Sequence, residues 1–430
     1  MNRRVLLGRL ARYGVFGAAS VAPLRWAMAQ RGEKKPEAAD EEEAEEEKKK
    51  STLVSDVEEF GRGRTRIALL LPNIEGPYRF AADAVLRGFQ AAHAIDGNGI
   101  YVKVMRIEED GFPDAELVFA ELEKERYSFV VGPLIRTSVN ALGAMTQLRL
   151  PTLLLNLPDQ NVPIPGNSVL FSLAIEYEGH SAARYAFAEA YQQVGPGRPL
   201  RALPISDKQQ LSKRSMDAFI QAWQAYGGEI ETPIVRTLGT LEETRDLLLE
   251  ARADVVFAAI DPDVMRTVRA AFAPTLPIYG TSRLDSGALP TLTNAHLIAT
   301  PELDGVRVIE MPWNLMPDHP AVALYPRSRR LPHVEMQRLY AFGIDAYRVT
   351  RELMAGREQF ELDGVTGRLM LDTTLDPRVA REPMLGEYRQ GILVPAYAPA
   401  GGSGGSDGAV ANPGSAPAGT GPGVGGAPRR

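Results

Sequence analysis

Residues 67–89 read IALLLPNIEGPYRFAADAVLRGF. The first five residues are all apolar, as in strands that are buried on both faces of a parallel sheet. The run ends at Pro72 and a polar loop, after which apolar residues recur at helical spacing. Those residues are Phe80, Ala84, Val85, Gly88 and Phe89. The stretch therefore predicts a buried strand, a loop and a helix, which is the repeating unit of α/β sheets.

The same alternation continues along the chain. In the first half we expect strands at 101–107, 129–131 and 152–155, with helices at 114–124 and from Thr137. After a restart near 178 we expect helices at 178–193, 209–226, 241–251 and 262–272, with strands at 200–205, 230–235, 255–260 and 278–280. A strand at 306–309, a long helix at 335–354 and β structure at 365–372 complete the pattern. The predicted fold class is α/β, with two doubly wound lobes whose parallel sheets are joined by several crossovers.

The chain of 430 residues divides by composition into a folded body and two flanking regions. The body is predicted at 64–397. We assign about 64–175 and 314–360 to lobe 1, and about 176–313 and 361–397 to lobe 2. Residues 30–63 are rich in charge and are expected to be a disordered linker. Residues 398–430 consist mostly of Gly, Pro, Ser and Ala, which predicts a disordered tail.

The first 29 residues are typical of a signal peptide that is cleaved on export. They contain five arginines and no acidic residue, an apolar run at 13–24, and the A-x-A pattern at 27–29. Residues 2–7 (NRRVLL) resemble a twin-arginine signal, so the twin-arginine and general secretory routes both stay open. The sequence thus predicts a periplasmic protein.

Composition excludes several kinds of site. The net charge of −6 disfavours nucleic acid as a partner, and the absence of cysteine excludes disulfides and Cys-ligated metals. No two of the five histidines have the spacing of a helical metal motif, and no glycine-rich nucleotide loop follows a strand. We therefore expect no catalytic residues, no metal and no cofactor.

Polar residues follow several of the predicted strands, where open α/β sheets bind ligands. The candidates for lining a cleft are Asn73, Tyr78, Thr137, Ser138, Tyr177, Asp207, Asp261, Ser282, Arg283 and Asp285. Thr137 and Ser138 are expected at a helix N-terminus, which favours an anionic group such as a carboxylate. Helix capping or solvation in a loop is the alternative role for each candidate.

Six segments carry a family resemblance. Residues 67–78 (IALLLPNIEGPY) and 130–134 (VVGPL) resemble strand–loop units of type 1 periplasmic solute-binding proteins. Four later segments resemble the LppC-type penicillin-binding-protein activators: 279–287 (YGTSRLDSG), 303–313 (LDGVRVIEMPW), 339–350 (LYAFGIDAYRVT) and 365–372 (VTGRLMLD). The resemblance covers about residues 64–394.

This resemblance implies a non-catalytic periplasmic regulator that binds a bifunctional peptidoglycan synthase and stimulates its transpeptidase. The sequence departs from the best-known members because it has no cysteine to acylate, so we expect no lipid anchor. It also lacks the long helical-repeat domain that precedes their receptor-like domain. The alternative function is a solute-binding receptor for an amino acid or another small carboxylate.

Individual residues of the late segments have more than one possible role. Asp304 is a candidate for contact with a partner and is also expected in a turn, and Gly343 is expected to permit close helix packing. Trp313 is either an anchor that faces a partner or a packing residue, and packing is favoured. Arg283 is either a cleft residue or a link between the lobes through a carboxylate such as Asp285.

Overall fold

The computed structural model describes residues 58–107, 111–231, 234–235, 252–271, 276–285, 287, 299–328, 330–331 and 333–397. The chain forms two compact units. Unit 1 takes the described residues up to Leu173 together with Leu324–Ala380, and unit 2 takes Ala174–Ala323 and the residues from Arg381. The predicted signal peptide, the tail, the helix at 241–251 and most of the linker lie outside the described residues.

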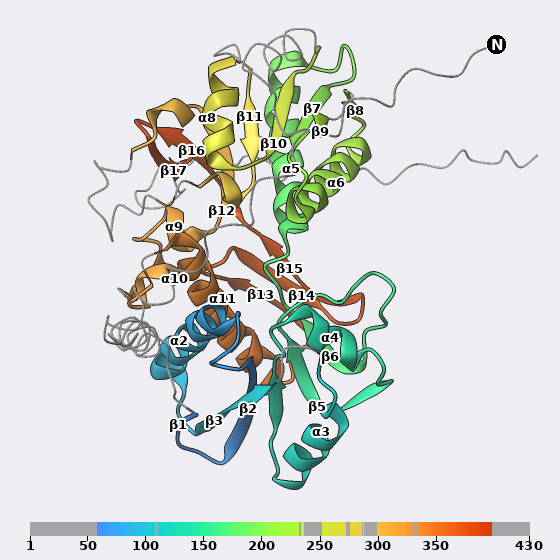
Figure 1. Ribbon diagram of the computed structural model, residues 1–430, viewed down its shortest axis with the longest axis vertical. Helices are drawn as coiled ribbons and strands as arrows, with labels where there is room; N and C mark the ends of the chain where they lie inside the picture. The colour runs from blue at the N-terminus through green and yellow to red at the C-terminus, as the bar shows by residue number, and fades with distance from the viewer. Residues whose placement is uncertain are drawn as a thin grey trace, which may run out of the picture. The chain divides into compact units, whose positions relative to one another are not determined.

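Unit 1 is built on a nine-stranded sheet (Figure 1). Its order is β1 (Glu59–Gly61), β3 (Ile100–Ile107), β2 (Thr65–Pro72), β4 (Phe129–Val131), β5 (Gln147–Leu154), β6 (Gly166–Leu170), β15 (Asp376–Glu382), β14 (Arg368–Asp372) and β13 (Gln359–Asp363). The ladders from β3 to β15 are parallel, whereas β1 pairs with β3, and β13 with β14, in antiparallel fashion. Its helices are α2 (Arg79–Asp96), α3 (Ala115–Lys124), α4 (Arg136–Leu142) and α11 (Val334–Met354).

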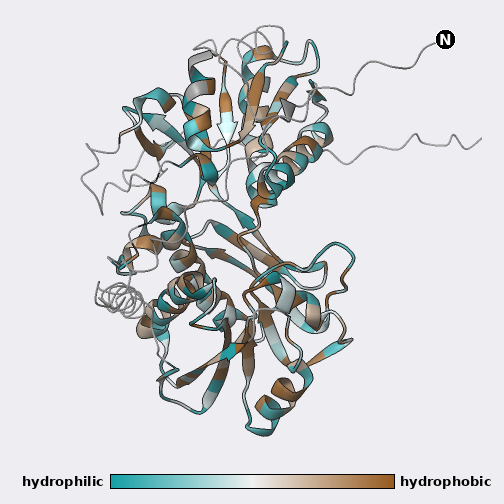
Figure 2. Ribbon diagram, in the orientation of Figure 1, coloured by the Kyte–Doolittle hydropathy of each residue, from teal (hydrophilic) through white to brown (hydrophobic). Residues whose placement is uncertain are grey.

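The apolar strands of unit 1 are buried because helices cover the sheet. Ala68 and Leu70 of β2 pack with Phe119 of α3 and Leu142 of α4 in one cluster. Helices α2 and α11 lie side by side and contact β2 and β4. Figure 2 shows hydrophobic residues concentrated along these central strands. The burial of 67–71 confirms the reading of this stretch as a strand covered on both faces.

Unit 2 is built on an eight-stranded sheet. Its order is β17 (Ile392–Pro395), β16 (Met384–Arg389), β12 (Val306–Glu310), β11 (Ile278–Gly280), β10 (Val255–Ala259), β7 (Arg201–Ser206) and β8 (Glu229–Ile230), with β9 (Ile234–Val235) also paired to β7. The ladders from β12 to β8 are parallel, and those of β16 with β12 and with β17 are antiparallel. Its helices are α5 (Ile175–Val194), α6 (Gln210–Ala225), α8 (Pro262–Ala271), α9 (Pro312–Leu315) and α10 (Pro320–Ala323), with short 3₁₀ turns at η1 (Ser282–Leu284) and η3 (Pro301–Leu303).

Two hydrophobic clusters cover the faces of this second sheet. Small residues of α5 such as Ala186 pack with Trp223 of α6 and Phe257 of β10 on one face. Met265 of α8 packs with Val256 and Val308 on the other face. Together the two units confirm the predicted class of two doubly wound lobes with mainly parallel sheets.

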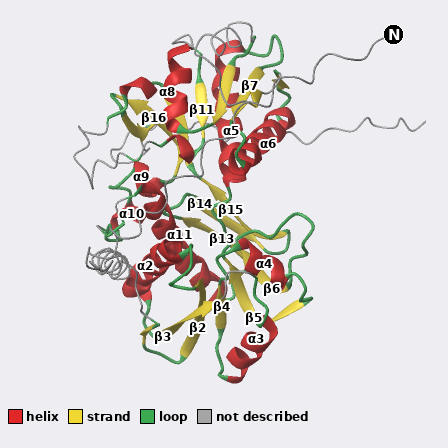
Figure 3. Ribbon diagram, in the orientation of Figure 1, coloured by secondary structure: helices red, strands yellow, loops and turns green. Residues whose placement is uncertain are grey.

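The structure corrects the predicted assignment of the late chain segments to the two lobes. Residues 361–380 contribute to β13, β14 and β15 in unit 1, whereas the sequence pattern assigns them to lobe 2. Residues 314–323 belong to unit 2 and not to lobe 1. The strand β1 also lies inside the predicted linker. Sequence order does not place these strands, because β15 pairs with β6, which is distant in sequence. Figure 3 shows β13, β14 and β15 as strands of unit 1.

Gly343 of α11 does permit close helix packing. A Cβ at this position would overlap the carbonyl oxygen of Val85 on α2, and a Cβ on Gly88 of α2 would overlap the carbonyl oxygen of Tyr340. Backbone oxygens cannot rotate away, so both glycines allow the two helices to approach. We expect Gly343→Ala to lower the free energy of unfolding by about 1–3 kcal/mol, measured by urea denaturation.

A matched control for this variant is Gly197→Ala. Nothing lies within 4 Å of a Cβ built on Gly197. Alanine there should be neutral or slightly stabilising because it restricts the unfolded chain. Equal stabilities for the two variants would contradict the packing role of Gly343.

Candidate functional site

The first candidates lie in the loop that joins β2 to α2. The side chain Oδ1 of Asn73 accepts a hydrogen bond from the backbone N–H of Glu75 at 3.4 Å, so Asn73 stabilises the turn. Tyr78 is 47% exposed, and Ile74 and Phe80 beside it are also exposed. We call Ile74, Tyr78 and Phe80 the 74–80 patch. The loop and the first turn of α2 thus present exposed apolar side chains after the end of β2.

The second pair of candidates, Thr137 and Ser138, lies in α4. This helix has seven residues and begins at Arg136, and no side chain caps it. Ser138 is fully buried and donates its hydroxyl to the carbonyl oxygen of Gly111 at 2.9 Å. The structure therefore contradicts the prediction that Ser138 faces a ligand, because a long-range contact inside unit 1 uses its hydroxyl. Thr137 is exposed on the first turn.

In unit 2, Arg283 and Asp207 form one polar cluster at the carboxyl ends of β7 and β11. Arg283 donates to Ser212 Oγ at 2.6 Å and to Gln209 Oε1 at 3.0 Å, and lies 3.7 Å from Asp207 Oδ2. Asp207 Oδ1 also accepts the backbone N–H of Gln209 at 2.9 Å. Asp285 Oδ1 accepts the backbone N–H of Gly287 at 3.0 Å, and the bonds of Arg283 to Gln209 and Ser212 tie η1 to the start of α6.

Asp261 and Tyr177 are placed at helix starts. The Oδ1 atom of Asp261 accepts the backbone N–H of Asp263 at 2.9 Å, and its carbonyl oxygen accepts the N–H of Met265. Asp261 is therefore the cap of α8, the alternative role considered for it. Tyr177 lies half-buried in the first turn of α5.

Ser282 belongs to a buried polar cluster that sequence patterns did not predict. Its backbone N–H and its hydroxyl both donate to the carboxylate of Glu178 on α5, at 2.8 and 3.2 Å. Arg381 of β15 lies 3.5 Å from the same carboxylate. The exposed fractions are 5% for Glu178 and 3% for Arg381, so this ion pair is almost completely removed from water. It joins α5, η1 and the end of β15 in unit 2.

The family-motif residues have mainly structural contacts. Asp345 of α11 is fully buried and accepts the backbone N–H groups of Val365 and Thr366 and the hydroxyl of Thr366. Arg348 donates to it at 3.1 Å. Burial raises the pKa of the Asp345 carboxyl, against the lowering by Arg348 and the other donors. Asp345 thus links the segment 339–350 to the segment 365–372.

Asp304 and Trp313 also serve the interior of unit 2. Asp304 Oδ1 accepts the backbone N–H of Gly391 at 2.7 Å, and its carbonyl oxygen accepts a hydrogen bond from Arg269. Trp313 is fully buried, which agrees with the packing role and not with an anchor that faces a partner.

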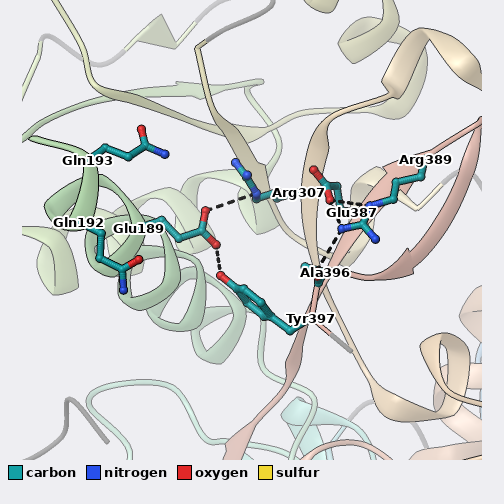
Figure 4. Close-up of a pocket in the computed structure, with 8 residues that line it drawn as sticks. All are labelled: Glu189, Gln192, Gln193, Arg307, Glu387, Arg389, Ala396 and Tyr397. Atoms are coloured by element: carbon teal, nitrogen blue, oxygen red, sulfur yellow. Dashed lines mark hydrogen bonds and ion pairs between the residues drawn. The ribbon is translucent and has the colours of Figure 1, made fainter. Parts of the chain in front are cut away.

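Two pockets lie in unit 2 away from these clusters. One of about 290 Å³ is lined by Glu189, Gln192, Gln193, Arg307, Glu387, Arg389, Ala396 and Tyr397 (Figure 4). The other, about 460 Å³, is lined by Arg198, Pro199, Arg201, Arg252, Ala253 and Asp254. In the second pocket Arg198 binds both carboxylate oxygens of Asp254, at 2.8 and 2.5 Å.

The first pocket contains a network centred on Glu189 of α5. Its carboxylate accepts the hydroxyls of Tyr279 and Tyr397 and lies 3.4 Å from Arg307 Nε. Burial and the bond to Glu189 raise the pKa of both tyrosines, so they stay neutral donors at neutral pH. The only sequence feature that singles out Arg307 as a possible site residue is its charge within the mostly apolar strand VRVIE. No sequence pattern points to Glu178 or Arg381.

The described ranges contain no cluster of His, Asp and Glu side chains that could hold a metal ion. No helix among the described residues combines the length and the hydrophobicity that a membrane-spanning helix needs.

Comparison with known proteins gives similarity to activators and to solute-binding proteins. Two proteins named penicillin-binding protein activator LpoA, from Enterobacter sp. strain 638 and Photobacterium profundum, are 26% and 24% identical. The alignments cover 68% and 71% of this chain but 44% and 53% of those proteins. The chain therefore spans about half the length of these curated relatives.

Solved structures show the same two kinds of neighbour. A protein from Chromobacterium violaceum described as a "putative branched-chain amino acid ABC transporter" is 31% identical, with a TM-score of 0.62 over 75% of this chain and 100% of that one. The C-domain of LpoA from Haemophilus influenzae, described as a regulator of PBP1A, is 22% identical, with a TM-score of 0.61 over 77% and 100%. Taken together, the two likenesses show that the fold is that of type 1 periplasmic binding proteins.

The family comparison covers most of both units. The model described as "LppC putative lipoprotein" matches residues 56–235 and 234–391. That description gives no support to our expectation of a chain without a lipid anchor, although the sequence has no cysteine. Since the match extends over more than half of the sequence, the chain belongs to the LppC family.

Proposed function

We propose that this protein is a non-catalytic periplasmic regulator that binds a bifunctional peptidoglycan synthase and stimulates its transpeptidase. In this proposal the N-terminal 29 residues direct export and are removed. The observation that carries the proposal is the LppC match across both units, together with relatives named penicillin-binding protein activators.

The contacts of the candidate residues support a scaffold more than a receptor. Ser138, Ser282 and Arg283 each bind groups of their own unit. Asp261 caps its helix. In a receptor, several of these side chains would have to break their present hydrogen bonds in order to bind a ligand. Breaking those bonds costs free energy.

A solute-binding receptor is the second candidate function. It is favoured by the Chromobacterium violaceum protein, which is 31% identical and is described as a "putative branched-chain amino acid ABC transporter". In this alternative a small carboxylate binds at the carboxyl ends of the strands, where Asp207 and Arg283 lie.

Affinity capture distinguishes the two functions. The full chain is immobilised and offered detergent-solubilised envelope, and the eluate is labelled with a fluorescent penicillin. We expect retention of a high-mass penicillin-binding protein. A folded protein that retains none, and that is stabilised by branched-chain amino acids in a thermal-shift assay, would contradict the regulator proposal.

A surface variant sharpens this experiment. Tyr78 and Phe80 are exposed aromatic residues, and aromatic residues are enriched among those that dominate binding energy. We expect Tyr78→Ser with Phe80→Ser to reduce retention of the synthase without lowering the melting temperature. Leu117→Ser on α3, where Leu117 is 71% exposed, is the matched control and should retain the synthase normally.

A further inference from the structure

The pocket of about 290 Å³ in unit 2 has two walls of different origin. Glu189, Gln192 and Gln193 come from the last turns of α5, and Arg307, Glu387 and Arg389 come from β12 and β16 (Figure 4). Arg307 and Glu387 are direct partners in the antiparallel ladder, so their side chains share one face of the sheet. The pocket therefore lies on the α5 face and not at the carboxyl ends of the parallel strands.

Arg307 is held in one orientation. Its Nε atom lies 3.4 Å from Glu189 Oε2, and its guanidinium lies over the ring of Tyr279, 5.4 Å from the ring centroid. Glu189 is fixed in turn by the hydroxyls of Tyr279 and Tyr397. The Arg307 side chain is 24% exposed. A guanidinium fixed in this way loses little entropy when it binds a further group.

The terminal nitrogens of Arg307 are available to a ligand. Within the described ranges neither of its two NH₂ groups has a hydrogen-bond partner. Glu387, directly opposite, pairs instead with Arg389 at 2.6 Å. The side-chain amides of Gln192 and Gln193 are exposed and also lack partners among the described residues. The pocket thus combines a half-buried cation with amide donors and acceptors beside it.

We propose that this pocket binds the carboxylate of a free amino acid or of the carboxyl terminus of a short peptide. The planar fork of Arg307 matches a carboxylate. The neighbouring glutamine amides and Glu387 can accept an ammonium or amide N–H beside that carboxylate. The volume lies near the lower limit of ordinary ligand pockets, which suits a ligand of one or two residues. This site is separate from the Asp207–Arg283 cluster and does not depend on the proposed regulator function.

Calorimetric titration of the full chain with small probes tests the proposal. The probes are both enantiomers of alanine, their N-acetyl derivatives, alaninamide and acetate. We expect saturable binding of alanine or N-acetylalanine, and none of alaninamide, which has no carboxylate. Tighter binding of N-acetylalanine identifies a peptide terminus as the ligand, and tighter binding of alanine identifies a free amino acid. If acetate binds as tightly as alanine or N-acetylalanine, the pocket is a simple anion site and the proposal is overturned.

Three variants test whether the probes bind in the pocket that contains Arg307. Arg307→Gln should weaken it on the order of tenfold or more, because a charged hydrogen-bonding partner is lost. Gln193→Ala should weaken it less, and this exposed position keeps the test valid if Arg307→Gln fails to fold. Arg283→Gln is the matched control at the carboxyl ends of the strands and should leave the affinity unchanged.

Three further results would overturn the proposal. The first is no binding of any carboxylate probe at millimolar concentration. The second is unchanged affinity in both Arg307→Gln and Gln193→Ala. The third is loss of binding in Arg283→Gln with binding retained in Arg307→Gln, which would place the ligand at the carboxyl ends of the strands.

Discussion

Asp345→Ala is expected to lower the free energy of unfolding of unit 1 by about 3–5 kcal/mol, since it removes a fully buried, paired carboxylate. The carboxylate accepts two backbone N–H groups, at 3.1 Å from Val365 and 2.8 Å from Thr366, and the Thr366 hydroxyl at 2.7 Å. Alanine would leave these donors buried without an acceptor, and each would cost about 1–3 kcal/mol.

Urea denaturation checks this value, with two further variants for comparison. Asp114→Ala changes an exposed aspartate of unit 1 whose side chain makes no capping bond, and should shift the unfolding free energy by about 0.5 kcal/mol or less. Asp345→Asn keeps the shape but places an NH₂ group against donors, so it should also destabilise strongly. A loss below about 1 kcal/mol for Asp345→Ala would show that the carboxylate is not what holds 365–366 to α11.

Glu178→Ala is expected to have an effect of similar size on unit 2. It removes the carboxylate that pairs with Arg381 and accepts two hydrogen bonds from Ser282. Because Arg381 is only 3% exposed, its charge would stay in a poorly solvated site. Breaking a buried pair from one side costs about 3–5 kcal/mol.

The same two elements provide a matched control. Arg184 of α5 and Glu382 of β15 form an ion pair of 3.7 Å in which each side chain is 35% exposed. Arg184→Ala should cost about 1 kcal/mol or less because water solvates both charges. The double variant Glu178→Leu with Arg381→Met should recover much of the loss. Equal effects of Glu178→Ala and Arg184→Ala would contradict the role assigned to burial.

The parallel core of both sheets could be predicted because its strands are apolar on both faces. Residues 67–71, 129–131 and 255–259 show this pattern, and each is a buried strand. The late strands could not be placed in the same way. Residues 359–363 alternate between exposed and half-buried positions, and only their pairing with 368–372 assigns them to unit 1.

The sequence predicts which polar side chains follow the strands, but it does not predict which groups those side chains bind. Strand ends do bring Asp207 and Arg283 together. Whether a polar side chain is available depends on contacts that are distant in sequence, such as Ser138 with Gly111 and Ser282 with Glu178. Sequence spacing carries no information about those contacts, and the Arg307 pocket was missed for the same reason.

The measurement that tests the regulator proposal most directly is peptidoglycan cross-linking by a purified bifunctional synthase from the same envelope, with and without this protein. The account predicts that the folded protein raises the proportion of cross-linked stem peptides and that heat-denatured protein does not. It also predicts a weaker effect for Tyr78→Ser with Phe80→Ser than for Leu117→Ser. Unchanged cross-linking at a saturating concentration of folded protein would contradict the account.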